Sequence, residues 1–220
     1  MGRDNWRPER IRHSPWGALA LAMLTGLALM RNGADLSPGP PQPVAATSVG
    51  GHQKLAPGAP KAGPAVKPLA YAPVARVGIP SIGVDAPVVD VNLDQDGWIE
   101  TPPPQDPNLA GWYQNGIAPG QLGTSVIVGH VDNHAGPAVF FQLGSLKKGD
   151  RVEIARSDDR VAVFEVYGVE VFAKNDFPGA RVYGDTGHAE LRVITCGGGY
   201  TKAHGYDGNV VVFARLVETR

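Results

Sequence analysis

Short runs of alternating apolar and polar residues follow one another from Tyr71 to the end of the chain. Valine, isoleucine and aromatic residues fill these runs, and glycine, proline, asparagine and aspartate bound them. A period of two places successive side chains on opposite faces of a strand, so the pattern predicts half-buried antiparallel strands. The predicted strands are two within Ala75–Val91, broken at Pro80 and Ser81, followed by Thr124–Val131, Asp150–Arg156, Arg160–Ala173, Glu190–Cys196 and Asn209–Val217.

Helical patterns are scarce in the same region. Ala138–Leu146 is the best candidate for a short helix, and Ala110–Tyr113 could form part of another. Closely spaced strands with little helix predict an all-β domain, either a barrel or a sandwich, over residues 71–220. Leu93–Gly97 resembles part of a calcium loop but lacks the full ligand series, so we predict a hairpin turn there and another at Ser157–Arg160.

The start of the chain has the pattern of an export signal. Residues 1–16 carry four arginines against two acidic residues, and Gly17–Met30 is an uncharged, mostly apolar run of fourteen residues. A basic flank before an apolar run is expected to stay in the cytoplasm. We therefore predict a cytoplasmic N-terminus over residues 1–16, a single membrane anchor over residues 17–30 and an extracytoplasmic domain. A cleaved signal peptide is the alternative, because a membrane span usually needs about twenty residues.

Residues 31–70 have the composition of a linker. Of these forty residues, eight are proline, six glycine and eight alanine, and none is aromatic or isoleucine. Such a segment buries too little apolar surface to offset the entropy of ordering. We expect an extended spacer that holds the folded domain away from a membrane.

Charge and cysteine content narrow the candidate chemistry. The formal net charge is −1 and no long basic block occurs, so nothing indicates a nucleic-acid partner. The chain has one cysteine, Cys196, which cannot form an internal disulfide. A lone cysteine in an exported chain is either a buried small hydrophobe or a reactive thiol.

Two short motifs lie where a predicted strand gives way to a loop. His130 follows Gly129 after one strand, and Cys196 precedes three glycines after another. A thiol is a strong nucleophile only as a thiolate, and an imidazole can both favour that ion and carry a proton to a leaving amine. Cys196 and His130 could therefore support acyl transfer through a thioester, although 66 residues separate them in the sequence.

Five blocks resemble the catalytic domain of the sortase family in order and spacing. They are RVGIPSIGVDAPVV, PGQLGTSVIVGHVDN, FFQLGSLKKGDRVEI, LRVITCGG and NVVVFARL. The resemblance runs from about Ala75 to Val217, and the double glycine after Cys196 with the HVDN context is most similar to class F sortases of actinobacteria.

The resemblance implies a fold and a reaction. The fold would be a closed eight-stranded sortase-type β-barrel with one or two short helices. Cys196 would be the nucleophile and His130 its partner in cleaving a C-terminal Leu-Pro-x-Thr-Gly-like sorting signal on another secreted protein. An amine from a cell-wall precursor or a pilin would then take the acyl group, and no metal or cofactor is expected.

One departure concerns the arginine that sortases use to stabilise the oxyanion or hold the substrate. The expected place, His204–Asn209, contains none. By alternation Arg192 shares a strand face with Cys196, so we predict Arg192 in this role, with Arg215 and the amide of Asn209 as alternatives. Asp132 could orient His130, although a turn-capping role together with Asn133 is favoured.

Two other functions compete with a transpeptidase. Cysteine enzymes that cross-link peptidoglycan also pair cysteine with histidine in β-rich folds, but they place the cysteine in a Ser-His-Gly-Cys-Arg-like run that this chain lacks. The second is a non-catalytic wall-associated binding module with a vestigial site, an alternative that the missing arginine leaves open.

Overall fold

The computed structural model describes residues 39–43 and 66–220. The predicted cytoplasmic N-terminus, the predicted anchor at residues 17–30 and most of the predicted linker lie outside the described residues. Within the described ranges, no helix has the length and apolar character that crossing a membrane requires.

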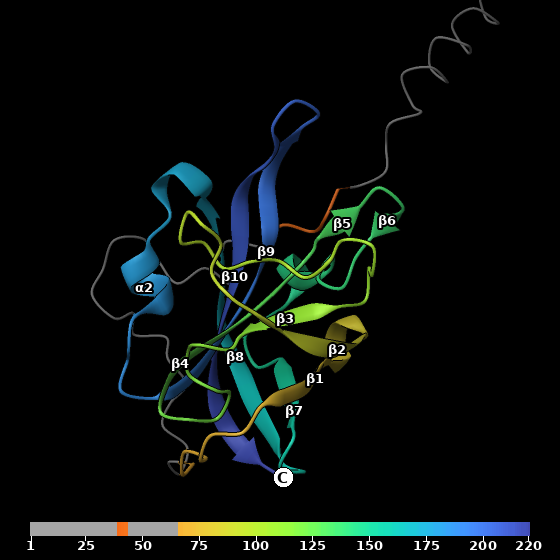
Figure 1. Cartoon of the computed structure of the whole chain (residues 1–220). Coiled ribbons are helices and arrows are strands. Elements are labelled where there is room, and N and C mark those ends of the chain that lie inside the picture. Colours follow the sequence, from red (N-terminus) through yellow and green to blue (C-terminus); the bar gives the residue numbers. More distant parts are fainter. Residues whose placement is uncertain (1–38, 44–65) are drawn as a thin grey trace, which may run out of the picture. The chain divides into compact units, whose positions relative to one another are not determined.

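Eight strands close into a barrel in the order β1-β2-β3-β4-β9-β10-β8-β7 (Figure 1). Neighbouring strands run antiparallel except for the parallel pairs β2–β3 and β4–β9. The prediction of an all-β, closed eight-stranded barrel is confirmed. The strands are β1 (Val74–Ile79), β2 (Val84–Val91), β3 (Ala110–Tyr113), β4 (Gly123–Gly129), β7 (Arg151–Arg156), β8 (Val161–Ala173), β9 (Ala189–Thr201) and β10 (Gly205–Thr219).

The remaining elements are short. A two-stranded ladder joins β5 (Asp132–Asn133) to β6 (Gly136–Pro137). The helical elements are η2 (Pro80–Ile82), η3 (Leu143–Ser145), η4 (Lys174–Asp176) and α2 (Gly179–Tyr183), of which the sequence pattern did not predict α2. Pro80 and Ser81 begin η2 between β1 and β2, so the predicted break between these strands is confirmed.

Both helix predictions were wrong. Ala110–Tyr113 is strand β3, which pairs in parallel with β2 and antiparallel with β4, contacts that its four residues do not encode. Ala138–Leu146 contains only the 3₁₀ turn η3. Phe140, Leu143 and Leu146 are all buried. Their three-residue spacing suits a 3₁₀ turn as well as an α-helix, because a 3₁₀-helix has three residues per turn.

The strand that contains Cys196 is longer than predicted. β9 continues to Thr201 and pairs with β10 from Gly205 onwards, so Cys196 lies within a ladder, directly opposite Asn209. Gly198 has φ +84°, and a Cβ there would meet the side chain of Asp207. The positive φ would strain any other residue, so glycine is favoured here within a strand, although its presence suggested a loop.

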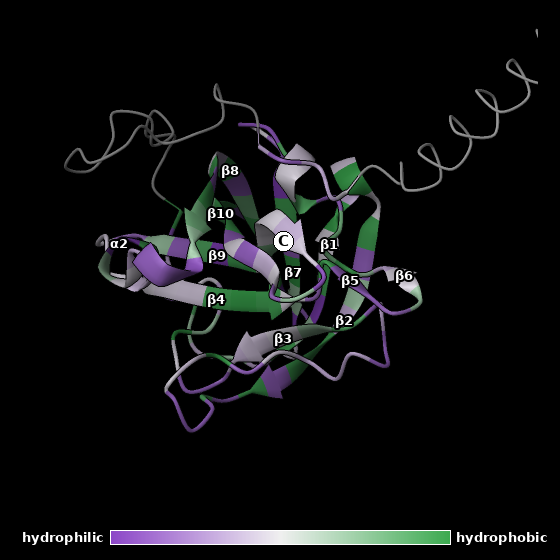
Figure 2. Cartoon of the chain, turned by 90° about the horizontal axis from the view of Figure 1, so that it is seen from above, coloured by the Kyte–Doolittle hydropathy of each residue, from purple (hydrophilic) through white to green (hydrophobic). Residues whose placement is uncertain are grey.

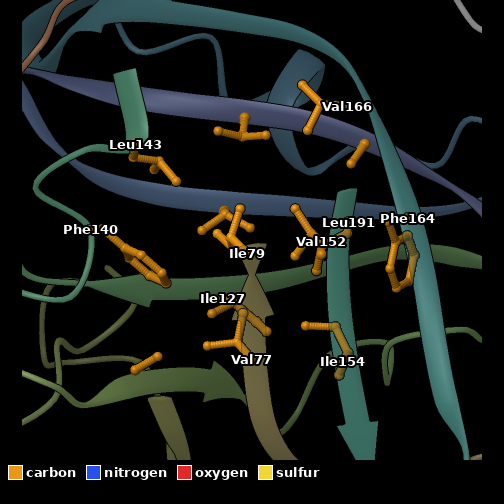
Figure 3. Close-up of a cluster of buried hydrophobic side chains, with 14 of the residues drawn as sticks. Val77, Ile79, Ile127, Phe140, Leu143, Val152, Ile154, Phe164, Val166 and Leu191 are labelled. Atoms are coloured by element: carbon orange, nitrogen blue, oxygen red, sulfur yellow. The ribbon is translucent and has the colours of Figure 1, made fainter. Parts of the chain in front are cut away.

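Apolar side chains pack on both faces of the barrel wall. The larger cluster fills the interior, where Val77, Ile127, Phe164 and Leu191 are completely buried (Figure 3). A second cluster, which includes Val128, Ile194 and Phe213, lies on the outer face of the wall beside Val182 of α2. Figure 2 shows hydrophobic residues recurring along the strands of the barrel wall. The site described below forms on the outer face.

Part of the predicted linker packs against the domain. Val66 and Leu69 contact the interior cluster, and the backbone N–H of Leu69 donates to the carbonyl of Gly120 at 2.8 Å. Farther towards the N-terminus, Gln42 Oε1 accepts a hydrogen bond of 3.3 Å from the N–H of Gly198. Ordered chain thus begins before the predicted boundary at Tyr71.

Candidate active site

Four neighbouring strands bring the predicted site residues onto one face of the barrel wall. Cys196 on β9 lies opposite Asn209 on β10, and Asn209 lies opposite Phe172 on β8. On the other side of β9, Val128 of β4 pairs with Ile194, so His130 comes just after β4 at the level of Cys196. Residues two apart on a strand share a face. The side chains of His130, Cys196 and Asn209 therefore follow one another across the wall.

These side chains line a pocket of about 250 Å³. Trp98, Ile99, Val128, Tyr183 and Ile194 form apolar walls around the polar groups. Another pocket, of about 410 Å³, lies between Ile82, Asn108 and Phe141 and has no cysteine, histidine or charged side chain in its lining. The combination of an apolar cleft with converging polar groups makes the pocket around Cys196 the candidate active site.

The two strands that carry His130 and Cys196 are tied together next to the site. The hydroxyl of Thr195, which is 4% exposed, donates to the carbonyl of Gly129 at 2.8 Å. Gly129 has no room for a side chain, because a Cβ there would lie 2.6 Å from the ring of Phe140. Buried contacts on either side thus fix the positions from which the imidazole and the thiol project.

The imidazole of His130 is held by the segment between β2 and β3. Its Nε2 lies 2.7 Å from the carbonyl oxygen of Pro102. A carbonyl can only accept, so Nε2 carries a proton in this contact, and Nδ1 is the nitrogen left to take up another. In the described part of the chain no hydrogen bond joins His130 directly to Cys196, although both line the pocket.

The thiol of Cys196 is half-buried, and its charge environment is mixed. Burial raises the pKa of the Cys196 thiol, the ammonium of Lys174 lowers it and the carboxylate of Asp132 raises it, with a net upward shift. The thiol is therefore mostly protonated at neutral pH, and attack on a carbonyl requires a base to remove the proton during the reaction.

This environment predicts slow alkylation of Cys196. At pH 7.5 iodoacetamide should react more slowly with the full-length protein than with a cysteine in an unstructured peptide, and the rate should rise steadily as the pH approaches the raised pKa. Asp132→Asn removes a charge that raises the pKa, so it should accelerate alkylation at fixed pH. Rapid alkylation with no pH dependence between pH 6 and 8 would contradict this account of the thiol.

Among the described residues, the hydrogen bonds of Asp132 go neither to His130 nor to the backbone of the turn. Its Oδ2 accepts a hydrogen bond of 2.5 Å from the hydroxyl of Tyr206. The cap belongs to Asn133, whose Oδ1 accepts from the N–H of Ala135 at 2.8 Å. Burial and the neighbouring Asp132 carboxylate raise the pKa of Tyr206, so its proton stays in this bond. Asp132 and Tyr206 thereby join the HVDN segment to the β9–β10 hairpin.

Arg192 does share the outer face with Cys196, but it does not line the pocket. It is 1% exposed, and its guanidinium donates to Oε2 of Glu190 at 2.6 Å and to the carbonyl of Val182 at 2.9 Å. Arg215 donates to the other oxygen of Glu190 at 3.0 Å. Arg192 and Arg215 thus belong to a structural ion-pair cluster around Glu190. Their engagement in this cluster does not favour the predicted substrate-binding role of Arg192.

Asn209 does line the pocket, as the third candidate for the position of the missing arginine. Lys174 and Thr101 also line it, and the sequence analysis did not single them out. Lys174 comes directly after the predicted strand Arg160–Ala173. His130 and Cys196 were singled out because they too lie at the ends of predicted strands. Its place beside Cys196 depends on two strand registers that the sequence does not reveal.

Metal ligands were not expected, and the described ranges contain no group of three histidine, cysteine or acidic side chains that could hold a metal ion.

Comparisons with known proteins agree with the fold. A family model described as the sortase domain matches residues 77–217. A comparison with curated proteins gives no match. The computed structure is similar to sortase A from Listeria monocytogenes, with a TM-score of 0.50 and 19% identity over 68% of this chain and 90% of the other.

Two further solved structures are similar to the same extent. The SrtA sortase from Actinomyces oris has a TM-score of 0.51 and 19% identity over 73% of this chain and 89% of the other. A lid mutant of sortase A from Corynebacterium diphtheriae has a TM-score of 0.52 and 20% identity over 68% of this chain and 73% of the other. At these identities the likeness establishes a common fold.

Proposed function

The chain belongs to the sortase family of transpeptidases, and we propose that Cys196 is the nucleophile and His130 the proton carrier of its acyl transfer. The observation that carries the proposal is the shared pocket, in which a thiol, an imidazole and an amide project from adjacent parts of one barrel wall. Nucleophilic catalysis needs a thiol and a base within reach of the same carbonyl.

The reaction begins with proton transfer from Cys196. Nδ1 of His130 takes the thiol proton as Sγ attacks the carbonyl carbon of the substrate, because the raised pKa keeps the resting thiol neutral. The tetrahedral intermediate collapses when the imidazolium returns this proton to the leaving amine nitrogen. The carbon–nitrogen bond breaks, and a thioester on Cys196 remains.

A second amine completes the transfer. It attacks the thioester carbon while Nδ1 of His130 removes one of its protons, and the same proton restores the thiol when the carbon–sulfur bond breaks. The side-chain amide of Asn209 lies opposite Cys196 and can donate to the oxyanion in both steps. Atoms and charges balance without a cofactor.

The proposed substrate is a secreted protein with a C-terminal sorting signal similar to Leu-Pro-x-Thr-Gly, cleaved after the threonine. The apolar walls of the pocket suit the apolar residues of such a signal. The proposed acceptor is an amine of a cell-wall precursor or of a pilin. Assignment to class F is part of the proposal and is supported by Gly197 and Gly198 after Cys196 and by the HVDN segment.

A membrane tether is also part of the proposal. Residues 17–30 would anchor the chain, and residues 31–70 would hold the catalytic domain outside the membrane, near secreted substrates. The support is the arginine-rich flank, the apolar run and the proline- and glycine-rich composition that follows.

A peptide assay tests the proposed function. Full-length protein in detergent is incubated with a Leu-Pro-x-Thr-Gly peptide library and an excess of an amine acceptor, and products are separated by chromatography. We expect cleavage between threonine and glycine and a new threonine–acceptor amide, both absent with Cys196→Ala. Uncleaved peptides with a folded protein and an alkylatable Cys196 would contradict the proposal and favour a non-catalytic binding module.

A further inference from the structure

Lys174 is the cationic side chain among the pocket-lining residues. It follows Ala173, which pairs with Gly208 of β10, and it lies two residues after Phe172, which pairs with Asn209. Phe172 thus extends the row of Cys196 and Asn209 by one more strand, and Lys174 begins η4 just beyond the end of that strand, where it lines the pocket. Its long, flexible stem allows the ammonium to move over the pocket.

The arginines near this wall are already engaged. Arg192 and Arg215 share the carboxylate of Glu190. Arg181 pairs with Glu170 at 2.5 Å and stacks on the rings of Phe172 and Phe213. None of the three contributes to the lining of the pocket. Moving one of them to the substrate would break a buried or half-buried ion pair, which is costly.

Resting on the proposed function, we propose that Lys174 is a catalytic residue whose ammonium contacts the substrate carbonyl oxygen and stabilises the negative charge that develops there. It would supply the positive charge that sortases take from an arginine, which is absent from His204–Asn209 in this chain. Asn209 would donate to the same oxygen from the neighbouring strand. A preorganised cation and an amide donor aimed at one oxyanion form a recognised means of lowering the barrier to acyl transfer.

The electrostatics of the thiol agree with this geometry. Among the charged groups around Cys196, Lys174 is the one that lowers the pKa of the thiol, whereas burial and Asp132 raise it. His130 and Tyr206 also face this region, His130 from the end of β4 and Tyr206 through its bond to Asp132. Lys174 is an exposed residue in the resting protein, so a bound peptide that displaces water would strengthen the interaction of its ammonium with the oxyanion.

The test compares Lys174→Ala and Lys174→Arg with the matched control Lys148→Ala, which alters an exposed lysine outside the pocket. Each full-length variant is assayed for kcat and KM on the cleaved peptide and for the pH dependence of Cys196 alkylation. Lys174→Ala should lose about ten- to a thousand-fold in kcat/KM, mostly in kcat. Its alkylation profile should move to higher pH, whereas Lys174→Arg should retain most activity and Lys148→Ala all of it.

The outcomes separate the inference from the proposed function. Wild-type cleavage with a Lys174→Ala variant that keeps kcat within twofold would overturn the role of Lys174 alone. A wild-type protein that cleaves no peptide would overturn the proposed function, and the catalytic role of Lys174 with it. Circular dichroism melting of each variant ensures that a loss of activity is not a loss of fold.

Discussion

Replacement of His130 by glutamine is expected to lower kcat/KM for peptide cleavage by about a hundred- to ten-thousand-fold, the range typical of losing a general acid–base. Glutamine can preserve the hydrogen bond to the carbonyl of Pro102 but cannot carry a proton between the thiol and the leaving amine. The raised pKa of Cys196 makes the loss severe, because few thiolates form without a base.

The matched control for His130→Gln is His134→Gln, which alters an exposed histidine in the turn between β5 and β6. His134 does not line the pocket, so its replacement should leave kcat/KM within about twofold of the wild type. Steady-state cleavage assays from pH 6 to 9 compare the two variants. Equal activity of His130→Gln and His134→Gln would exclude His130 as the proton carrier.

Replacement of Glu190 by alanine is expected to destabilise the domain by about 3–5 kcal/mol, the cost of breaking a buried ion pair from one side. Glu190 and Arg192 are each 1% exposed, and the carboxylate also accepts from the hydroxyl of Tyr167 at 2.8 Å. The substitution leaves the guanidinium of Arg192 buried without its carboxylate. For a domain of this size, the melting temperature should fall by roughly 6–20 °C.

The pH dependence of stability should report the same cluster. Burial alone would raise the pKa of Glu190, but Arg192, Tyr167 and Arg215 outweigh it and hold the pKa below the ordinary value. A lowered folded-state pKa gives stability that is present above the unfolded pKa and is lost as the pH falls through the folded value. The wild type should therefore lose this contribution only in acid, and Glu190→Ala should lack it throughout.

Calorimetric melting of the full-length protein measures both effects. Glu218→Ala is the matched control, since it removes a carboxylate from an exposed pair with Arg151 and should change the melting temperature little. If Glu190→Ala melts like the control, the cluster does not stabilise the barrel.

The sequence predicted the barrel well where strands carry their own pattern. Val161–Ala173 is rich in valine and aromatic residues and was predicted almost to its ends. β3 could not be predicted, because Ala110–Tyr113 is extended through pairing with β2 and β4 rather than through its own alternation. At Ala138–Leu146 an apolar spacing of three and four residues favoured an α-helix, although the chain there forms only a 3₁₀ turn.

The positions of single residues in the site could also be predicted only in part from the sequence. Alternation correctly assigned Arg192 and Cys196 to one face of β9, but it gave no information about what covers that face along its length. Val182 and Glu190 enclose the Arg192 end, and the pocket opens only near Ile194 and Cys196. Lys174 could not be predicted because its position depends on the pairing of β8 with β10 and of β10 with β9.

The central claim is that Cys196 forms a covalent acyl-enzyme, and intact-mass spectrometry tests it most directly. Full-length protein is mixed with a cleavable sorting-signal peptide without an amine acceptor and quenched in acid at short times. We predict a mass increase equal to the peptide up to its threonine, mapped to Cys196 by digestion and absent from Cys196→Ala. Peptide cleavage that persists in Cys196→Ala, with no adduct on the wild type, would contradict the account.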